Sequence, residues 1–453
     1  MTPDLDKPTA REGARDLGVL RVASFRRLWA ANLAGSVGQQ FGTLALSVTA
    51  VTTLHASTFE MSVIAALGSM AYLVLGIPSG VWVDRWSKRR VLLTAEVVRA
   101  VAIAGVPIAF VLGVLSVAQL MVVAAVTGVA DLFFGVAHTS ILPAIVSRAR
   151  VSEASARLQT SDTTIRVVGP GLAGQILQFT GGPLVYGVTA ITHALSWLFI
   201  SGIDVAEPTS GNTTGNTSGN AARDTTRHAA RNGARDRERE PFWNSLRTGL
   251  GFVAGHPVLR TFLMSGALIN LGAGAYSAVL ALFVLRDLGL SPALFGLATS
   301  IGALGGIIGS LAGLRVKKAL GSIRAVIVCY CSLSAAFAMV PLTAVLPVPH
   351  VVPITVSSLL FSALLVMASI SSTGINARVT PYSLMGRVTS ARRFVTMGAV
   401  PVGAMVGGLV ATLTGNTWTL WLAALLAALT IVPFACSPLL TVRELPGTWE
   451  AET

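Results

Sequence analysis

Long apolar stretches dominate the chain and alternate with short polar segments. Many of these stretches run for 18 or more residues with few charges, which is long enough for a helix to cross a bilayer. The pattern therefore predicts an all-α polytopic membrane protein. We expect twelve spans, at residues 28–53, 60–82, 91–113, 117–143, 156–179, 183–203, 259–284, 293–314, 322–345, 350–374, 390–413 and 417–438.

The spans fall into two groups of six on either side of a hydrophilic segment. Residues 205–242 are rich in Gly, Asn, Thr and Arg and lack apolar periodicity, which is typical of disorder. Similar Gly-rich and basic stretches recur at matching places in the two groups, as in transporters built from structural repeats. The expected organisation is an N-terminal segment at 1–27, helical halves at 28–204 and 259–440, a largely disordered linker at 205–258, and a tail at 441–453.

Composition and charge narrow the class of protein further. Of 453 residues, 53% are hydrophobic and 12% are charged, so a soluble enzyme is excluded. The net charge of +13 does not indicate nucleic-acid binding, because the basic residues collect in alternate loops between the spans. The positive-inside rule then places the linker and both termini in the cytoplasm.

The segment "GVWVDRWSKRR", residues 80–90, joins the second and third spans. Gly80 would allow a close helix approach, and the charges would lie among the inner headgroups; a loop that only sets topology is the alternative. The segment resembles the signature G-x-x-x-D-R-x-G-R-R of the major facilitator superfamily, with Ser87 in place of a glycine. The resemblance implies a conformational latch that holds the outward-open state, with its partner near residues 390–393. The implied latch residues are Gly80, Asp84, Arg85, Arg89 and Arg90.

Three further stretches resemble one group within that superfamily. They are "SFRRLWAANLAGSVGQQF" at 24–41, "FFGVAHTSILPAIV" at 133–146 and "MGRVTSARRFVTMGAVPVGAMVGG" at 385–408. All three are similar to bacterial drug and siderophore exporters of the macrolide-efflux and enterobactin-exporter type. The resemblance covers the chain outside the linker, and it implies a twelve-helix, two-half transporter.

The segment "RVVGPGLAGQ", residues 166–175, contains the G-x-G-x-x-G pattern of a dinucleotide-binding turn. That turn requires a strand before it and an acidic residue about 20 positions later, and neither is present. Pro170 instead predicts a helix kink, and Gly169 and Gly174 predict close helix contact. The segment resembles the fifth-span antiporter motif G-P-x-x-G-G of drug exporters, although ordinary small-residue packing is the alternative.

Charged residues inside the membrane are costly and point to function. Asp131 in the fourth span lies about 14 residues from the cytoplasmic face and Arg166 in the fifth about 11, so at ~1.5 Å per residue their depths differ by only ~5 Å. We expect them to pair and to couple transport to protons, or else to form a permanent structural ion pair. His138, on the same helix face as Asp131, is a candidate for the proton path or a packed histidine. Glu96 and Arg99 are expected to pair locally near the cytoplasmic end.

Polar side chains at helical spacing mark a candidate substrate cavity. The first span carries such a stripe on an otherwise apolar helix, and the resemblance adds residues of the seventh and tenth spans. Helix–helix hydrogen bonds are the alternative for each of them. Gln39 stands where many relatives carry an acid, which leaves Asp131 as the better coupling candidate. The cavity candidates are Asn32, Ser36, Gln39, Gln40, Thr43, Asn270, Tyr276, Ser372 and Asn376.

Taken together, these features predict a secondary transporter that exports small hydrophobic organic molecules in exchange for protons. No phosphate-binding G-x-x-x-x-G-K-[ST] occurs in the sequence, so the proton gradient is the expected energy source and no cofactor or metal is expected. We expect the protein to work as a monomer. Two alternatives stay open: a siderophore or other solute transporter, possibly for uptake, and a transport-inactive sensor or scaffold.

Overall fold

The computed structural model describes residues 18–76, 78–147, 150–203, 242–381, 384–442, 444 and 446. These residues are all helical or irregular, and no strand occurs among them. The N-terminal half begins with a short 3₁₀ helix, Gly18–Arg21. Its longer helices are α1 (Ala23–Val48), α2 (Thr58–Val74), α3 (Pro78–Arg85), α4 (Lys88–Val111), α5 (Val117–Ile145), α6 (Val151–Thr180) and α7 (Gly182–Ser201).

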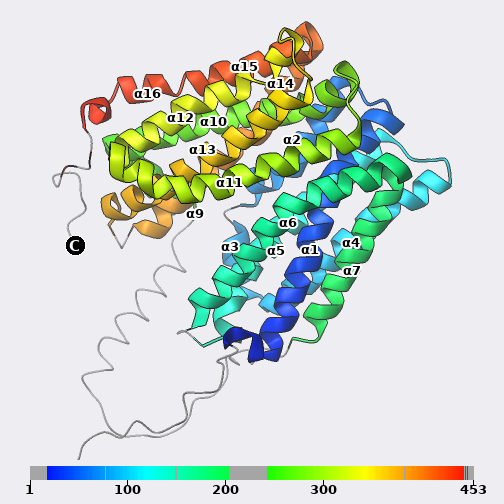
Figure 1. Ribbon diagram of the computed structural model, residues 1–453. Helices are drawn as coiled ribbons and strands as arrows, with labels where there is room; N and C mark the ends of the chain where they lie inside the picture. Colours follow the sequence, from blue (N-terminus) through cyan, green and yellow to red (C-terminus); the bar gives the residue numbers. More distant parts are fainter. Residues whose placement is uncertain are drawn as a thin grey trace, which may run out of the picture.

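The C-terminal half is a second bundle of helices that lies beside the first (Figure 1). It contains α9 (Phe242–Gly255), α10 (Pro257–Leu282), α11 (Pro292–Leu320), α12 (Ser322–Ala338), α13 (Val351–Val379), α14 (Met385–Thr414), α15 (Asn416–Ala428) and α16 (Ile431–Ala435). A π-helical turn extends α1 over Thr49–Thr53, and another extends α10 over Phe283–Asp287. The 3₁₀ helices Pro341–Ala344 and Pro438–Thr441 complete the described elements.

Helix length and apolarity agree with a membrane protein that crosses the bilayer many times. Within the described ranges, 9 helices are long and apolar enough to span a membrane, or 10 if the bent pair α2 and α3 forms one span. The helices α1 and α6 are as long as the others, but the charges and polar stripe that they carry keep them below that apolarity. The predicted all-helical membrane fold is confirmed, with the count of spans by apolarity lower than twelve.

The predicted linker at 205–258 needs a correction at its C-terminal end. Residues 242–255 form the helix α9, which packs along α14. The contact is close, because a Cβ added to Gly249 would lie 2.5 Å from the carbonyl oxygen of Arg387. The stretch 204–241, which carries most of the predicted disorder, lies outside the described residues, as do residues 1–17 and 447–453.

The two halves touch at one end of the molecule and separate toward the other. We call the end where α7 finishes and α9 begins the linker end, and the opposite one the closed end. At the closed end two apolar clusters mix side chains of both halves, such as Phe41 with Phe295 and Ala66 with Phe283. At the linker end, each half has a cluster of its own, around Phe25 in one and Phe262 in the other.

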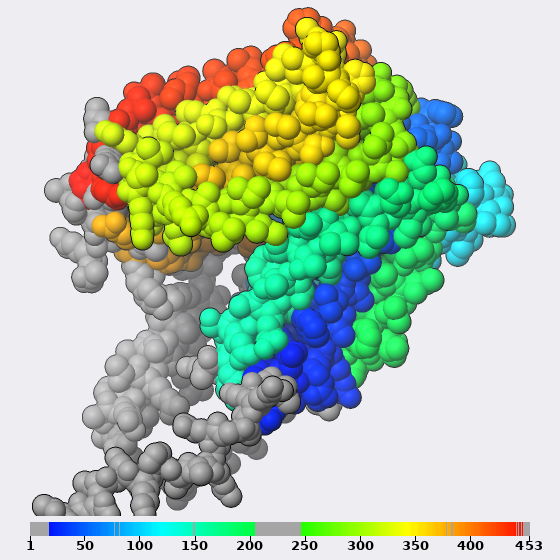
Figure 2. All heavy atoms as spheres, viewed as in Figure 1, coloured from blue at the N-terminus to red at the C-terminus, as the bar shows by residue number. Residues whose placement is uncertain are grey.

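Figure 2 shows the same divergence on the surface, where α6 and α11 meet at one side and part at the other. Between them lies a cavity of about 400 Å³, lined by residues of α6 from Gln159 to Val168 and by Ile307 of α11. The fold therefore holds a conformation that is open at the linker end.

Candidate functional site: a buried charge network beside a cavity

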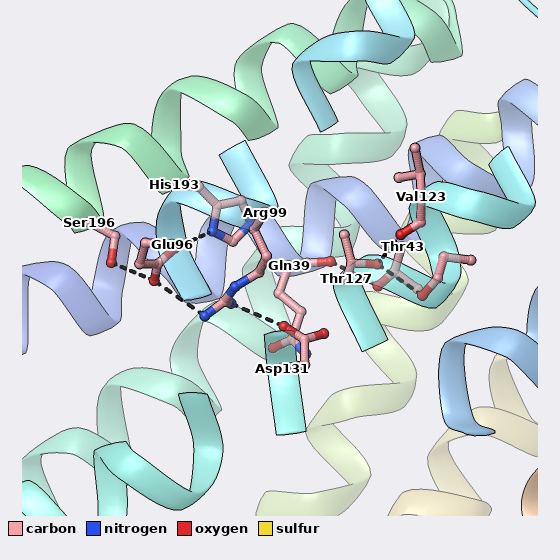
Figure 3. A network of polar contacts seen from close by, with 10 residues as sticks. Gln39, Thr43, Glu96, Arg99, Val123, Thr127, Asp131, His193 and Ser196 are labelled. Carbon is pink, nitrogen blue, oxygen red and sulfur yellow. Dashed lines mark hydrogen bonds and ion pairs between the residues drawn. The ribbon is translucent and has the colours of Figure 1, made fainter. Parts of the chain in front are cut away.

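Five polar side chains from three helices of the N-terminal half form one connected network (Figure 3). Glu96 Oε2 lies 2.8 Å from His193 Nδ1, and Glu96 Oε1 accepts a hydrogen bond of 2.8 Å from Ser196 Oγ. Arg99 joins this pair to α5, because its guanidinium lies 3.4 Å from Glu96 Oε1 and 3.1 Å from Asp131 Oδ1. One arginine thus bridges two carboxylates.

Exposure changes along the network from its inner to its outer end. Glu96 and Ser196 are fully buried and His193 is 2% exposed, whereas the Asp131 side chain is 32% exposed. The Arg99 guanidinium also lies 4.3 Å from the centre of the Phe134 ring, a cation–π contact. Buried charges persist only when paired and hydrogen-bonded, and the bridging arginine meets that condition here. Asp131 is the carboxylate through which the network meets the cavity.

Glycines on α1 face the side chains of this network. A Cβ added to Gly38 would lie 2.3 Å from Thr192 Oγ1 and 3.2 Å from His193 Nε2, and one added to Gly35 would lie 3.5 Å from Glu96 Oε1. The close packing of α1 and α7 beside the buried His193 therefore depends on the missing side chain at Gly38, whereas a Cβ at Gly35 would be in ordinary contact with Glu96.

A cavity of about 210 Å³ borders the network on the side of Asp131. All of its lining residues belong to the N-terminal half, and they carry two carboxylates and two guanidinium groups: Asp131, Asp162, Arg99 and Arg166. A second, smaller hollow of about 110 Å³ also borders Asp131 and Arg99, and reaches His193 and Tyr186. The charged groups of the network thus line these two cavities of the N-terminal half.

The expected partner of Asp131 is corrected by the structure. Asp131 pairs with Arg99 of α4, whereas Arg166 is exposed and forms no ion pair with any described residue. The residue counts predicted similar depths in the membrane for Asp131 and Arg166, but they do not say which helices are neighbours. Because α5 packs extensively on α4 and barely touches α6, its carboxylate meets the arginine of α4. Arg166 still lines the same cavity.

Two other expectations for charged residues are also resolved by these contacts. Glu96 and Arg99 do form the predicted local pair, but the pair is buried and extends to α5 and α7, which we did not expect. His138 stacks on Phe134, with ring centres 5.6 Å apart, and its buried Nε2 has no hydrogen-bond partner among the described residues. His138 is not hydrogen-bonded to Asp131, and its contacts favour a packed histidine over a member of the proton path.

The cavity candidates divide between the two halves. Asn32, Ser36, Gln39 and Gln40 line the 210 Å³ cavity, and Gln39 and Thr43 line the smaller hollow. Thr43 donates a hydrogen bond to its own helix, at the Gln39 carbonyl. The C-terminal candidates line neither: Asn270 donates to the Gly266 carbonyl, Tyr276 packs on Phe337, Ser372 donates to the Ser369 carbonyl, and the Asn376 amide has no partner within the described ranges.

Sequence reasoning missed the residue that organises the polar stripe of α1. Asp162 of α6 accepts hydrogen bonds from Asn32 Nδ2 at 2.7 Å and from Ser36 Oγ at 2.8 Å. It lies in the Thr- and Ser-rich stretch "TSDTTIR", inside the span that we expected at 156–179, but no role was assigned to it. The sequence could have pointed to Asp162, because an acidic residue inside an expected membrane span is a functional candidate in the same way as Asp131.

The predicted latch residues make local contacts in this conformation. Asp84 and Arg85 are exposed, and no ion pair joins them to the described residues 390–393. Lys88 Nζ donates to the Asp84 carbonyl at 2.9 Å, and Arg89 donates to the Ser201 carbonyl at the end of α7. A Cβ on Gly80 would meet no atom of the described residues within 4 Å, so the close approach expected there is absent from this conformation. A latch for the outward-open state would be disengaged when the linker end is open.

The glycines around Pro170 lie at the contact between the halves. A Cβ on Gly174 would lie 2.6 Å from the Pro292 carbonyl oxygen, and one on Gly296 would lie 2.3 Å from the Pro170 oxygen. Gly171 N–H donates to Ser300 Oγ of α11 at 2.6 Å. Gly169 faces Gln40 of α1, where a Cβ would be 2.9 Å from the Gln40 Cβ. The helix α6 continues through Pro170, and this segment forms the contact with α11 at the closed end.

Two helical bundles that meet at one end and separate at the other, with a polar cavity in one of them, are typical of membrane transporters of the alternating-access type. The family comparison agrees: the model of the Major Facilitator Superfamily matches residues 28–400, and the chain belongs to that superfamily. It is a transporter and not an enzyme. Within the described residues, no group of three or more His, Cys, Asp or Glu side chains could hold a metal ion.

Individual relatives are more distant. The chain is 30% identical over 152 residues to the multidrug efflux pump Tap of Mycolicibacterium fortuitum, a match that covers 32% of this chain and 37% of that protein. Among solved structures, a bacterial homologue of the iron transporter ferroportin in an inward-facing state has a TM-score of 0.68 at 15% identity, covering 92% of this chain and 98% of that one. The nucleoside transporter NupG has a TM-score of 0.66 at 13% identity, covering 91% and 99%. These structures share the fold alone.

Proposed function

We propose that the protein is a proton-coupled exporter of small hydrophobic organic molecules that works by alternating access. The observation that supports this most directly is the carboxylate–arginine network of Asp131, Arg99 and Glu96, which borders a polar cavity of the N-terminal half. The similarity of part of the chain to a multidrug efflux pump supports export and the class of substrate. The proposal includes placement in a bacterial inner membrane.

The basic loops support an orientation for this cycle. Positively charged loops lie on the cytoplasmic side, and they cluster at the linker end, where α3 and α4 meet at Arg85–Arg90. The described conformation would then open to the cytoplasm, ready to take up a substrate for export. Transport requires the opposite conformation, in which the contact between α6 and α11 opens and the linker end closes.

The network supplies a physical route for coupling. When Asp131 is ionised, it holds Arg99 between two carboxylates; when Asp131 takes a proton, Arg99 keeps only the buried Glu96 as its ionic partner. The side chain of Arg99 would then move toward α4 and α7, and its link to α5 would be lost. Because Asp131 faces the cavity and Glu96 does not, we assign the exchangeable proton to Asp131.

The test is proton movement in liposomes that contain the purified protein and a pH-sensitive dye. An outward gradient of substrate drugs should drive proton movement in the wild type, and Asp131→Asn should reduce it at least tenfold while the protein still melts at a similar temperature. The matched control is Asp287→Asn, an exposed acid at the closed end that accepts a hydrogen bond from Asn416. Asp287→Asn should retain coupled flux.

Undiminished coupled flux in Asp131→Asn would refute the assignment of the proton to this residue. If that variant fails to fold, Asp131→Glu provides the second measurement, because it keeps the charge beside Arg99 and should retain proton movement. Flux that runs only toward the side of the linker would instead establish the uptake alternative.

A further inference from the structure

A second carboxylate faces the cavity without a cation. Asp162 Oδ1 accepts two hydrogen bonds from α1, one from Asn32 and one from Ser36. One turn earlier on α1, Trp29 Nε1 donates to Ser161 Oγ at 2.7 Å, which fixes the register of α6 against α1 at this point. The carboxylate is thus held in one orientation by neutral donors, and its second oxygen, Oδ2, accepts no hydrogen bond from a described residue.

The charge around Asp162 differs from that around the other two acids of this half. Asp131 and Glu96 share the guanidinium of Arg99, whereas Asp162 forms no ion pair with any residue that the structure describes. Arg166 lies one helical turn further along α6 and lines the same cavity, but it makes no ion pair either. A half-buried carboxylate that has lost part of its hydration gains from a cation brought by a ligand.

The place of Asp162 in the cavity suits the first contact with a substrate. It lies 11 residues from the start of α6 at the linker end, or ~16 Å at ~1.5 Å per residue, and Asp131 lies 14 residues from the end of α5, or ~21 Å. Asp162 is therefore nearer to the open end than Asp131. The aromatic rings of Tyr72 and Phe134 line the same cavity and offer an apolar surface for the body of a ligand.

We infer that Asp162, positioned by Asn32 and Ser36, forms a subsite for the cationic group of a substrate, such as a protonated amine or a quaternary ammonium. This inference rests on the proposed transport function. It divides the two cavity carboxylates by role: Asp162 binds the charge of the substrate, and Asp131 with Arg99 handles the proton. The positive charge of Arg166, one turn away, repels such a ligand and so lowers its affinity for this subsite.

The experiment measures equilibrium binding of two fluorescent aromatic probes to the purified protein in nanodiscs. Ethidium is a permanent cation, and Nile red is uncharged. Asp162→Asn should lower the ratio of ethidium affinity to Nile red affinity by about 10- to 100-fold, the range for loss of one contact to a charged group. Arg166→Gln should raise the same ratio several-fold, because it removes a repulsive charge. The control is Glu153→Gln, an acid on the same helix that pairs with Arg157 outside the cavity.

Opposite changes in Asp162→Asn and Arg166→Gln, with no change in Glu153→Gln, would support the subsite. Equal losses for both probes in Asp162→Asn, or a lower ratio in Arg166→Gln, would overturn it. If Asp162→Asn does not fold, Arg166→Gln alone decides the question by the sign of its effect. The binding assay needs no proton gradient, so a failure here leaves the coupling test of Asp131 standing, and a failure of that test leaves this one standing.

Discussion

The contact between α6 and α11 at the closed end offers the sharpest test of the alternating-access interpretation. In Gly296→Ala the new Cβ would lie 2.3 Å from the Pro170 carbonyl oxygen and 2.9 Å from Gly174 Cα, where ordinary contact begins at 3.4 Å. Both neighbours are backbone atoms and cannot rotate away. The helices must therefore separate by about 1 Å, or the closed end must open.

The magnitude follows from the cost of overpacking, which is roughly 1–3 kcal/mol for an inserted methyl group in a well-packed contact. The cost applies only to the conformation in which α6 and α11 touch, so it acts as a bias between the two states. A bias of that size changes the ratio of the two conformations by about 5- to 150-fold, in favour of the one in which α6 and α11 have separated.

The assay is the distance between spin labels at residues 159 and 314, which are exposed on α6 and α11 toward the linker end. The native cysteines are first replaced. In Gly296→Ala the distance distribution should shift to shorter values, because the linker end closes as the other end opens. The matched control is Gly306→Ala on the same helix, where the new Cβ would lie 3.7 Å from Val366 Cγ2 in ordinary contact. An unchanged distribution in Gly296→Ala, or the same shift in Gly306→Ala, would refute this reasoning.

Two further predictions concern the buried network. Arg99→Met should lower the stability of the purified protein by about 3 kcal/mol, seen as a lower melting temperature, because it leaves Glu96 buried without its arginine; a melting temperature equal to that of the wild type would contradict the bridging role. Gly38→Ala should lower the melting temperature through contact with Thr192 Oγ1, and the double variant Gly38→Ala/Thr192→Ala should recover part of the loss. Simple additivity of the two single effects would argue against the contact.

Helix positions followed from the sequence with few errors because they depend on local properties. Apolar length predicts a span and its approximate ends; α7 runs from Gly182 to Ser201, where we expected 183–203. The helix α9 was missed because its apolar face is short and follows a charged, Gly-rich stretch.

The candidate site depended on information that the sequence does not contain. Asp131 was identified from its cost in a membrane, but its partner was not, because a depth along an axis does not say which helices are neighbours. The packing of α5 against α4 selects Arg99 over Arg166. Asp162 was overlooked although it lies inside the span expected at 156–179, and only the contact with α1 shows that it organises the stripe.

By itself, the sequence determined the class of the protein: an all-helical membrane protein with long apolar helices, basic loops and membrane-embedded charges. Those properties follow from the energetics of placing each residue in lipid or water, which depend on the residue and its near neighbours. The tertiary structure alone decided which charges pair, which carboxylate lines the cavity without an ion pair to a described residue, and which end of the molecule is closed. These depend on the rotation and neighbours of each helix, which are set by contacts between residues far apart in the chain, such as Gly174 with Gly296.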